Sequence, residues 1–220
     1  LRILLVGGKT RQIKMKVSKY PTLNRCLFIL NWQLATVGKF EIVNVLGLVT
    51  YQQELELSAL AETFEQRPEI SSVTYEPAKN HWLQTRFAPD ETYVPFYRNG
   101  KCSIVGATSA EHFEQIVKRV NTLMRELLEF DYEPTAEIKN IVATAELDSL
   151  LPLEAIAIGL GLEQTEYEPE QFPALIYRGG ESALLVFSSG KIVCMGLTDL
   201  DQISSAIDGI TERIEAISVS

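Results

Sequence analysis

Apolar and polar residues recur with regular periods from residue 40 onward, whereas the first 39 residues follow neither a helical nor a strand period. After Thr108, helical spacing connects Phe113, Ile116, Val117, Val120, Leu123, Met124, Leu127 and Leu128. After Thr198, the same spacing connects Ile203, Ala206, Ile207, Ile210, Ile214 and Ile217. These patterns predict two long amphipathic helices, each with one apolar face.

The starts of both helices carry a capping-box spacing. Thr108 is followed three residues later by Glu111, and Thr198 by Asp201. In a capping box the threonine side chain accepts a backbone N–H of the first turn, and the acid reaches back to the cap. We therefore predict that the two threonines are the N-caps.

Two short apolar runs, 183–187 and 192–195, flank Gly190-Lys191 and predict a β-hairpin. Alternate residues of a strand point to opposite faces of the sheet, and both faces of these strands are apolar. Helices on one side can bury only one set, so the other set must face a partner. That second set is Leu185, Phe187, Val193 and Met195.

The patterned region contains an internal repeat of about 90 residues. Residues of the first half that recur in the second in the same order are Asn44 (Asn140), Tyr75 to Pro77 (Tyr167 to Pro169), Arg86 (Arg178), Gly100-Lys101 (Gly190-Lys191), Gly106 (Gly196) and Thr108 (Thr198). We divide the chain into an extension, 1–39, a first repeat, 40–131, and a second repeat, 132–220. Each repeat is expected to form a strand, short helices, several strands and a long helix.

Two stretches of the second repeat, YEPEQFPALIYR at 167–178 and FSSGKIVC at 187–194, closely resemble the second repeat of the archaeal-type TATA-box-binding proteins. In the first repeat the resemblance is weaker and depends on spacing, Asn44 and the Gly100-Lys101 hairpin. The resemblance implies an α+β fold. Two pseudo-symmetric repeats would form a saddle with a curved ten-stranded antiparallel sheet, helices on its convex face and DNA against its concave face.

The family resemblance also implies a mode of DNA binding, in which apolar side chains wedge into and kink the minor groove. Phe172 and Phe187 would be the wedge pair, and Asn44 and Asn140 would donate to the minor-groove acceptors of A·T pairs. The implied DNA-contacting set is Asn44, Leu46, Tyr97, Ser103, Val105, Asn140, Val142, Phe172, Arg178, Leu185, Phe187, Ser189, Lys191, Val193 and Met195. Among these, Arg178, Ser189 and Lys191 would contact phosphates, which position the protein without reading sequence.

The first repeat departs from the family pattern at the wedge. Asn80 stands where the second repeat has Phe172, Tyr97 where it has Phe187, and Ser103 where it has Val193. Neighbouring Trp82 would replace Asn80 if the loop shifts by two residues; the alternative is a partly exposed loop aromatic. We hypothesise that DNA is kinked strongly at the end contacted by the second repeat, and weakly or by different residues at the other.

The family resemblance also implies a function and binding partners. It implies a general transcription factor that binds double-stranded TATA-box promoter DNA and recruits transcription factor B and RNA polymerase, with no catalysis, metal or cofactor. Glu168, Glu170 and Gln171 would lie in the loop that meets transcription factor B. The sequence leaves open whether the free protein forms a homodimer through its apolar face. It also leaves a second interpretation, a degenerate paralogue that binds proteins without kinking DNA, for which the altered first wedge is the main support.

Charge is distributed unevenly along the chain. The net charge is −9, but residues 1–39 hold eight basic residues and no acid, so residues 40–220 carry 12 basic against 29 acidic residues, or −17. Such an acidic body predicts DNA binding that tolerates or requires high salt, because salt screens repulsion from phosphates. The extension is either a basic arm that contacts nucleic acid or an upstream stretch without fixed structure; its lack of periodicity favours the second.

Other chemistry is weakly supported. Gly7 to Thr10 resembles the end of a phosphate-binding loop, but Ile3 stands where the first glycine is required. Cys26, Cys102 and Cys194 lack metal-site spacing and are expected to be isolated thiols. His81 and His112 show no catalytic pattern in the sequence, which disfavours a nuclease or glycosylase on this fold. With no apolar run of about 20 residues, we expect no membrane association and a cytoplasmic, nucleoid-associated protein.

Overall fold

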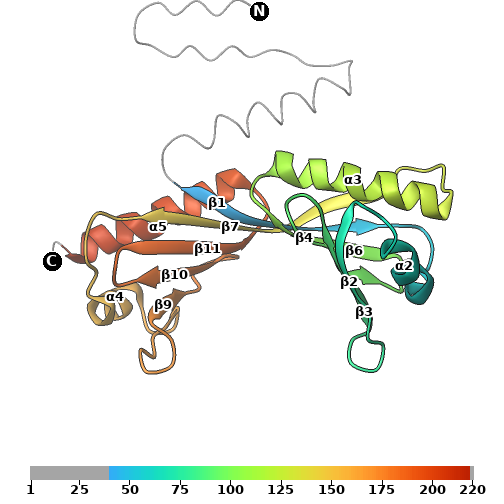
Figure 1. Cartoon of the computed structure of the whole chain (residues 1–220). Coiled ribbons are helices and arrows are strands. Elements are labelled where there is room, and N and C mark those ends of the chain that lie inside the picture. The colour runs from blue at the N-terminus through green and yellow to red at the C-terminus, as the bar shows by residue number, and fades with distance from the viewer. Residues whose placement is uncertain (1–39, 219–220) are drawn as a thin grey trace, which may run out of the picture.

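A computed structural model describes residues 40–218 of the chain (Figure 1). The expectations for the basic extension, the Gly7 to Thr10 string and Cys26 lie outside the described residues.

Each repeat contains one short helix and one long helix around a set of strands. The first repeat comprises β1 (Glu41–Thr50), α2 (Leu57–Phe64), β2 (Ile70–Thr74), β3 (Trp82–Phe87), β4 (Thr92–Tyr93), β5 (Phe96–Tyr97), β6 (Lys101–Ala107) and α3 (Ala110–Leu128). The second comprises β7 (Thr135–Glu146), α4 (Leu153–Leu160), β8 (Thr165–Glu166), β9 (Ala174–Tyr177), β10 (Ala183–Phe187), β11 (Lys191–Leu197) and α5 (Leu200–Ser218).

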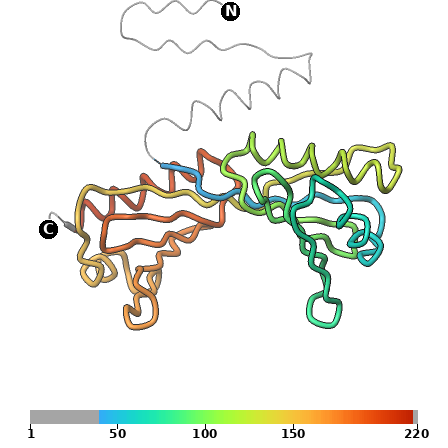
Figure 2. Tube along the Cα trace, viewed as in Figure 1, coloured from blue at the N-terminus to red at the C-terminus, as the bar shows by residue number. Residues whose placement is uncertain are grey.

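The strands form one antiparallel sheet in the order β2-β3-β4-β6-β1-β7-β11-β10-β9-β8, with β1 and β7 adjacent at its centre. The long helices α3 and α5 lie along one face, and the loops β2–β3 and β8–β9 descend from the opposite side (Figures 1 and 2). The α+β saddle, the two long helices and the hairpin at Gly190 are thus confirmed.

The sheet has eleven strand segments where ten were expected. The additional segment arises because one strand of the first repeat is divided: β4 pairs with β3 and β6, and β5 pairs with the same two strands. Pro95 stands in the gap and has no N–H for the ladder, so it interrupts the pairing. In the second repeat Leu185 takes the corresponding place, and β10 is continuous.

The hydrophobic core lies between the sheet and the helices. In β10 and β11, Leu184, Val186, Ile192 and Cys194 are buried while the alternate residues are only partly covered. Ile116, Val120 and Met124 of α3 are fully buried, as the helical period requires. The apolar stripe of each helix therefore covers one set of strand side chains and leaves the other set on the concave face.

The predicted helix caps are wrong by one residue. Ser109 accepts the backbone N–H of His112 at 3.0 Å, and Asp199 accepts that of Gln202 at 3.0 Å. Since α3 begins at Ala110 and α5 at Leu200, these residues and not Thr108 and Thr198 are the N-caps. Each threonine instead lies between the last strand of its repeat and the N-cap residue of the helix that follows.

None of the helices within residues 40–218 has the length and apolar character needed to cross a bilayer.

Candidate nucleic-acid interface

The uncovered face of the sheet gathers side chains from every central strand. Strand register puts residues that lie opposite one another on the same face, and this links Leu46 to Val105, Leu48 to Ser103, Thr144 to Val193, and Leu185 to both Val193 and Ile176. In the second repeat this face is mostly aliphatic. In the first repeat Ser103 and Gln84 make it more polar.

Two asparagines lie at the middle of this face. Asn44 of β1 is opposite Val142, and Asn140 of β7 is opposite Leu46. Each amide oxygen accepts a backbone N–H: Asn44 Oδ1 from Gly106 at 2.9 Å, and Asn140 Oδ1 from Gly196 at 2.7 Å. An amide whose oxygen accepts such a bond must direct its NH₂ group elsewhere, so each asparagine can present a donor.

The two glycines that donate to these amides lie at irregularities of the sheet. The ladder register shifts beside each of them, between Val45 and Leu46 opposite β6 and between Cys194 and Leu197 on β11. Gly106 and Gly196 have φ values of +102° and +98°, a region that favours glycine. Each glycine forms a bulge whose N–H is free from the ladder and available to the asparagine.

Phe172 and Phe187 form a pair at one end of the face. Phe187 lies opposite Ala174, two residues after Phe172, and the two rings meet edge to face with centroids 6.4 Å apart. Phe172 is 40% exposed, which is unusual for a phenylalanine in a folded chain. The pair is thus presented outward from the end of β10 and the loop before β9.

The opposite end of the face carries different aromatic residues. Trp82 of β3 lies opposite Tyr97 of β5, and both are partly exposed. Asn80, the counterpart of Phe172, belongs to the loop, where its backbone N–H donates to the carbonyl of Glu76 at 2.8 Å. The backbone N–H of Phe172 makes the equivalent bond to Glu168 at 2.9 Å, so the two loops match without a two-residue shift. Trp82 therefore reaches the face from its own strand position.

Charged groups border the face. The Nε of Arg178 donates to Glu166 at 3.1 Å, so this arginine is engaged within the chain. Lys191 and Ser189 are exposed at the β10–β11 turn. In the β8–β9 loop, Gln171 donates to the Glu168 carboxylate and Glu170 is exposed.

Several residues of this face were not singled out from the sequence. They are Leu48, Gln84, Tyr93, Thr144 and Ile176, all partly exposed. Four of them lie opposite residues of the predicted set, and Gln84 shares a face of β3 with Trp82. The alternation along β1 and β7 could have identified Leu48 and Thr144. The paired glycines at 106 and 196 were visible as repeat matches, but their hydrogen bonds depend on strand register.

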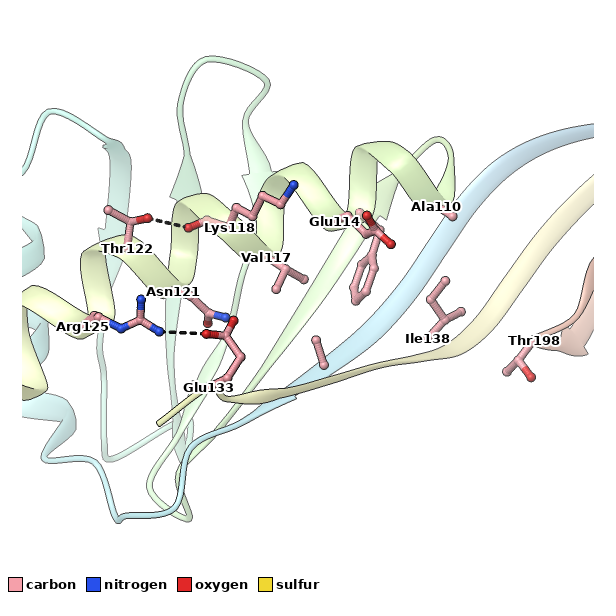
Figure 3. A pocket seen from close by; sticks show the side chains of 12 residues that line it. Ala110, Glu114, Val117, Lys118, Asn121, Thr122, Arg125, Glu133, Ile138 and Thr198 are labelled. Carbon is pink, nitrogen blue, oxygen red and sulfur yellow. Dashed lines mark hydrogen bonds and ion pairs between the residues drawn. The ribbon is translucent and has the colours of Figure 1, made fainter. Parts of the chain in front are cut away.

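A groove lies on the helix side of the sheet, between α3 and the start of β7 (Figure 3). Phe113, Val117 and Ile138 form its apolar floor, and Arg125 pairs with Glu133 at 2.9 Å along its rim. Ala136 of the second repeat lines the groove, and the matching position of the first repeat holds the larger Phe40. The groove is thus an asymmetry of packing between the repeats.

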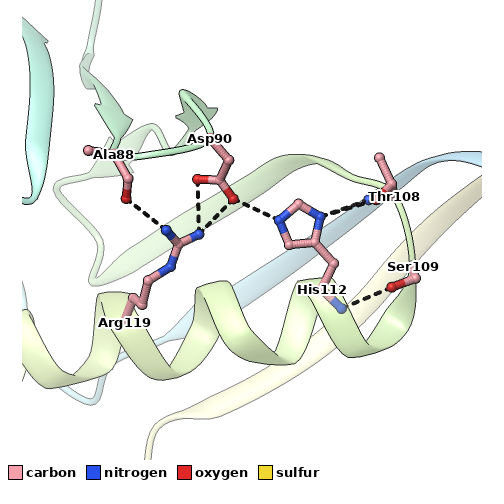
Figure 4. Close-up of polar contacts among 6 residues, drawn as sticks. All are labelled: Ala88, Asp90, Thr108, Ser109, His112 and Arg119. Carbon is pink, nitrogen blue, oxygen red and sulfur yellow. Dashed lines mark hydrogen bonds and ion pairs between the residues drawn. The ribbon is translucent and has the colours of Figure 1, made fainter.

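His112 belongs to a polar cluster that the sequence did not reveal (Figure 4). Its Nε2 lies 2.7 Å from Asp90, and its Nδ1 lies 3.2 Å from the Thr108 hydroxyl. Both Asp90 oxygens also accept Arg119, at 2.8 and 3.0 Å. Burial opposes ionisation of Asp90, but the bonds from Arg119 and His112 hold its pKa well below the usual range. The cluster ties the β3–β4 turn to α3.

Cys102 and Cys194 are free and buried, as expected of isolated thiols. Burial raises the pKa of Cys102 to about 12 and that of Cys194 to about 11, so both are protonated at neutral pH. Residues 40–218 contain no group of three or more His, Cys, Asp or Glu side chains arranged to hold a metal ion.

Comparison with known proteins gives a consistent result. The family model described as transcription factor TFIID, or TATA-binding protein, matches residues 39–127 and 135–217. TATA-box-binding protein 2 of Haloferax volcanii is 37% identical over 182 residues, covering 81% of this chain and 95% of the relative. The TATA-box-binding protein of Picrophilus torridus is 33% identical over 192 residues, covering 84% and 100%. Among solved structures, the TATA-binding protein (TBP) of Methanococcus jannaschii matches with a TM-score of 0.69 and 31% identity, covering 81% of this chain and 99% of that one.

Proposed function

Because the chain belongs to the TATA-box-binding protein family and is therefore a general transcription initiation factor, we propose that its concave face binds and bends the minor groove of A/T-rich promoter DNA. The observation that carries this proposal is the asparagine pair. Each amide oxygen is held by a glycine N–H, so both NH₂ groups are available as donors at the centre of an otherwise apolar surface. The minor groove of A·T pairs offers only acceptors, whereas G·C adds a donor that would oppose them.

The two ends of the face act differently in this proposal. Phe172 and Phe187 are the wedge at the second-repeat end, supported by their exposed edge-to-face pair. Trp82 and Tyr97 serve the first-repeat end, supported by their cross-strand pairing. Asn80 has too short a side chain to unstack bases, so the first kink is expected to be weaker.

The aliphatic residues around the asparagines contact the floor of the widened groove. Leu46, Val105, Val142, Leu185, Val193 and Met195 have this role, with Ser103 as a polar member. Lys191 and Ser189 bind phosphate at the rim. Arg178 joins them by exchanging its Glu166 partner for a phosphate, since either anion satisfies the guanidinium.

Transcription factor B binds the β8–β9 loop through Glu168, Glu170 and Gln171, and RNA polymerase follows it. The exposure of this acidic loop supports the first contact. The protein acts on the chromosome in the cytoplasm and without catalysis. The absence of catalysis is supported at His112, because both nitrogens of its imidazole and both oxygens of the Asp90 carboxylate already have partners within the chain.

The test is fluorescence-detected bending of a doubly labelled TATA-box duplex across a salt series, with and without transcription factor B. Phe172→Ala/Phe187→Ala should abolish most of the bending, because an alanine cannot enter a base step. The matched variant Trp82→Ala/Tyr97→Ala removes aromatic residues from the other end and should reduce bending by a smaller amount.

Each outcome has a clear meaning. Bending that survives in the Phe172→Ala/Phe187→Ala variant would refute the wedge. Absence of bending at any salt concentration, with factor B still bound, would indicate a protein-binding module. The net charge of −17 on residues 40–220 predicts that binding persists at high salt. A steep loss of affinity as salt rises would contradict that part of the proposal.

A further inference from the structure

Exposed apolar side chains gather around α4 at one end of the saddle. Leu150, just before the helix, is 85% exposed, while Ile158 in its last turn and Leu162 just after it are each 71% exposed. Within residues 40–218 five large apolar side chains are exposed, and three of them are these. Single exposed apolar residues are common on protein surfaces, but a cluster indicates a contact surface. We name Leu150, Ile158 and Leu162 the α4 patch.

The first repeat provides an internal comparison for this patch. The backbone N–H of Leu55 donates to Arg98, and that of Leu151 donates to Ser188, each at 2.9 Å. The buried faces of the two helices also match position by position: Leu57, Leu60, Ala61 and Phe64 in α2, and Leu153, Ile156, Ala157 and Leu160 in α4. The two segments are therefore built alike.

At the positions of the α4 patch, however, the first repeat has Glu54, Glu62 and Gln66, all exposed. The same local fold thus forms with polar residues at these positions, and nothing in its packing requires aliphatic ones. Exposing three aliphatic side chains to water is unfavourable. We attribute their presence in the second repeat to a partner that covers them.

The surroundings of the patch indicate the chemistry of that partner. Residues 147–172 contain six acidic residues and no lysine or arginine, and the basic Lys191 borders the patch only at Leu150, with which it lines a hollow. Glu154 and Glu163 are exposed beside the patch. An apolar surface with an acidic border is complementary to an apolar ridge bordered by lysine or arginine.

The patch is also continuous with the β8–β9 loop. Leu162 is separated from β8 by only two residues, and the Thr165 hydroxyl donates to the carbonyl of Gly161 at 3.0 Å. At the start of the loop, partial burial and the neighbouring Glu154 of α4 raise the pKa of Tyr167. The loop and α4 are thus tied to each other, and one partner can contact both.

We propose that the protein that binds the β8–β9 loop also covers the α4 patch, with an apolar ridge flanked by basic side chains. This inference rests on the proposed function, in which that protein is transcription factor B. It assigns the apolar part of the contact to Leu150, Ile158 and Leu162, and leaves the loop acids to provide charge complementarity. Burial of these aliphatic side chains against a partner contributes to the binding free energy in proportion to the apolar area removed from water.

The experiment measures binding of purified transcription factor B to the complex of the full chain with TATA-box DNA. Ile158→Ala/Leu162→Ala truncates the patch, and Glu62→Ala/Gln66→Ala makes the same truncation at the matching positions of the first repeat. All four side chains are exposed, so neither variant should unfold the protein. We expect the first variant to weaken factor B binding about 10- to 100-fold, and the second to change it less than about twofold. DNA bending without factor B should be unaltered in both.

The outcomes separate this inference from the proposed function. Equal factor B binding by both variants would overturn the inference and leave DNA bending intact. If the unaltered chain bends DNA but does not bind factor B, the inference is also overturned. If the unaltered chain does not bend DNA, the proposed function fails first. A photoreactive side chain at position 158 should cross-link to factor B only within the complex, and one at position 62 should not.

Discussion

Replacing Asn140 with aspartate tests the central donor of the proposed interface with almost no change of shape. The aspartate keeps an oxygen that can accept the N–H of Gly196, which lies 2.7 Å from the amide oxygen. It replaces the outward NH₂ group with a second carboxylate oxygen. The fold should therefore be unaffected, whereas the DNA acceptors lose a donor and face a negative charge.

The expected loss follows from these changes. A hydrogen bond contributes about 0.5–1.5 kcal/mol, and a buried acceptor left without a donor costs about 1–3 kcal/mol. Together they predict a loss of about 1.5–4.5 kcal/mol in binding free energy, or a dissociation constant raised roughly 10- to 2,000-fold. The carboxylate could accept the N2 amino group of guanine, so the loss should be smaller when a central A·T pair is changed to G·C.

The assay is fluorescence-detected binding of a labelled TATA-box duplex at one fixed salt concentration. Gln115→Glu is the matched control, because it adds the same charge on the exposed side of α3, away from the concave face. Thermal unfolding of both variants should lie within about 2 °C of the unaltered chain. If Asn140→Asp binds as tightly as Gln115→Glu, the asparagine does not donate to DNA and the reasoning is wrong.

Two further predictions concern the fold. Asp90→Asn should lower the free energy of unfolding by about 1–2 kcal/mol at pH 7, because it removes a charge-assisted partner of Arg119 and His112. Since the folded pKa of Asp90 is depressed, its contribution is present above the unfolded pKa of about 4 and disappears as pH falls through the folded value. Denaturant titrations at pH 7 and pH 3 should show the deficit shrinking, and a constant deficit would contradict this cause. Gly196→Ala should cost about 1–2 kcal/mol because its φ is +98°, whereas Gly180→Ala, in open space and without a positive φ, should be nearly neutral. Equal melting temperatures for the two glycine variants would show that the bulge tolerates a side chain.

Much of the architecture could be predicted because it depends on local periodicity. The helical spacing after residue 108 and after residue 198 required two amphipathic helices, and the doubly apolar strands around Gly190 required a sheet with one uncovered face. The internal repeat then implied that the two halves would be built alike. Helix starts were less certain, since Thr108 and Ser109 are both capping residues and only the backbone geometry selects between them.

Other features depend on residues that are distant in sequence, and only the tertiary structure decided them. Asn44 meets Gly106, and Asp90 meets Arg119, through strand register and helix packing that no local pattern encodes. The exposure of Ile158 could not be inferred either, because an apolar residue in a short helix is equally consistent with burial until its neighbours are known. By itself the sequence determined the repeat, the elements and the apolar second face, since these follow from periods of two and 3.6 residues along one segment. The direction of the asparagine donors and the free surface of α4 required the folded chain, because each depends on which distant groups come within hydrogen-bonding or packing distance.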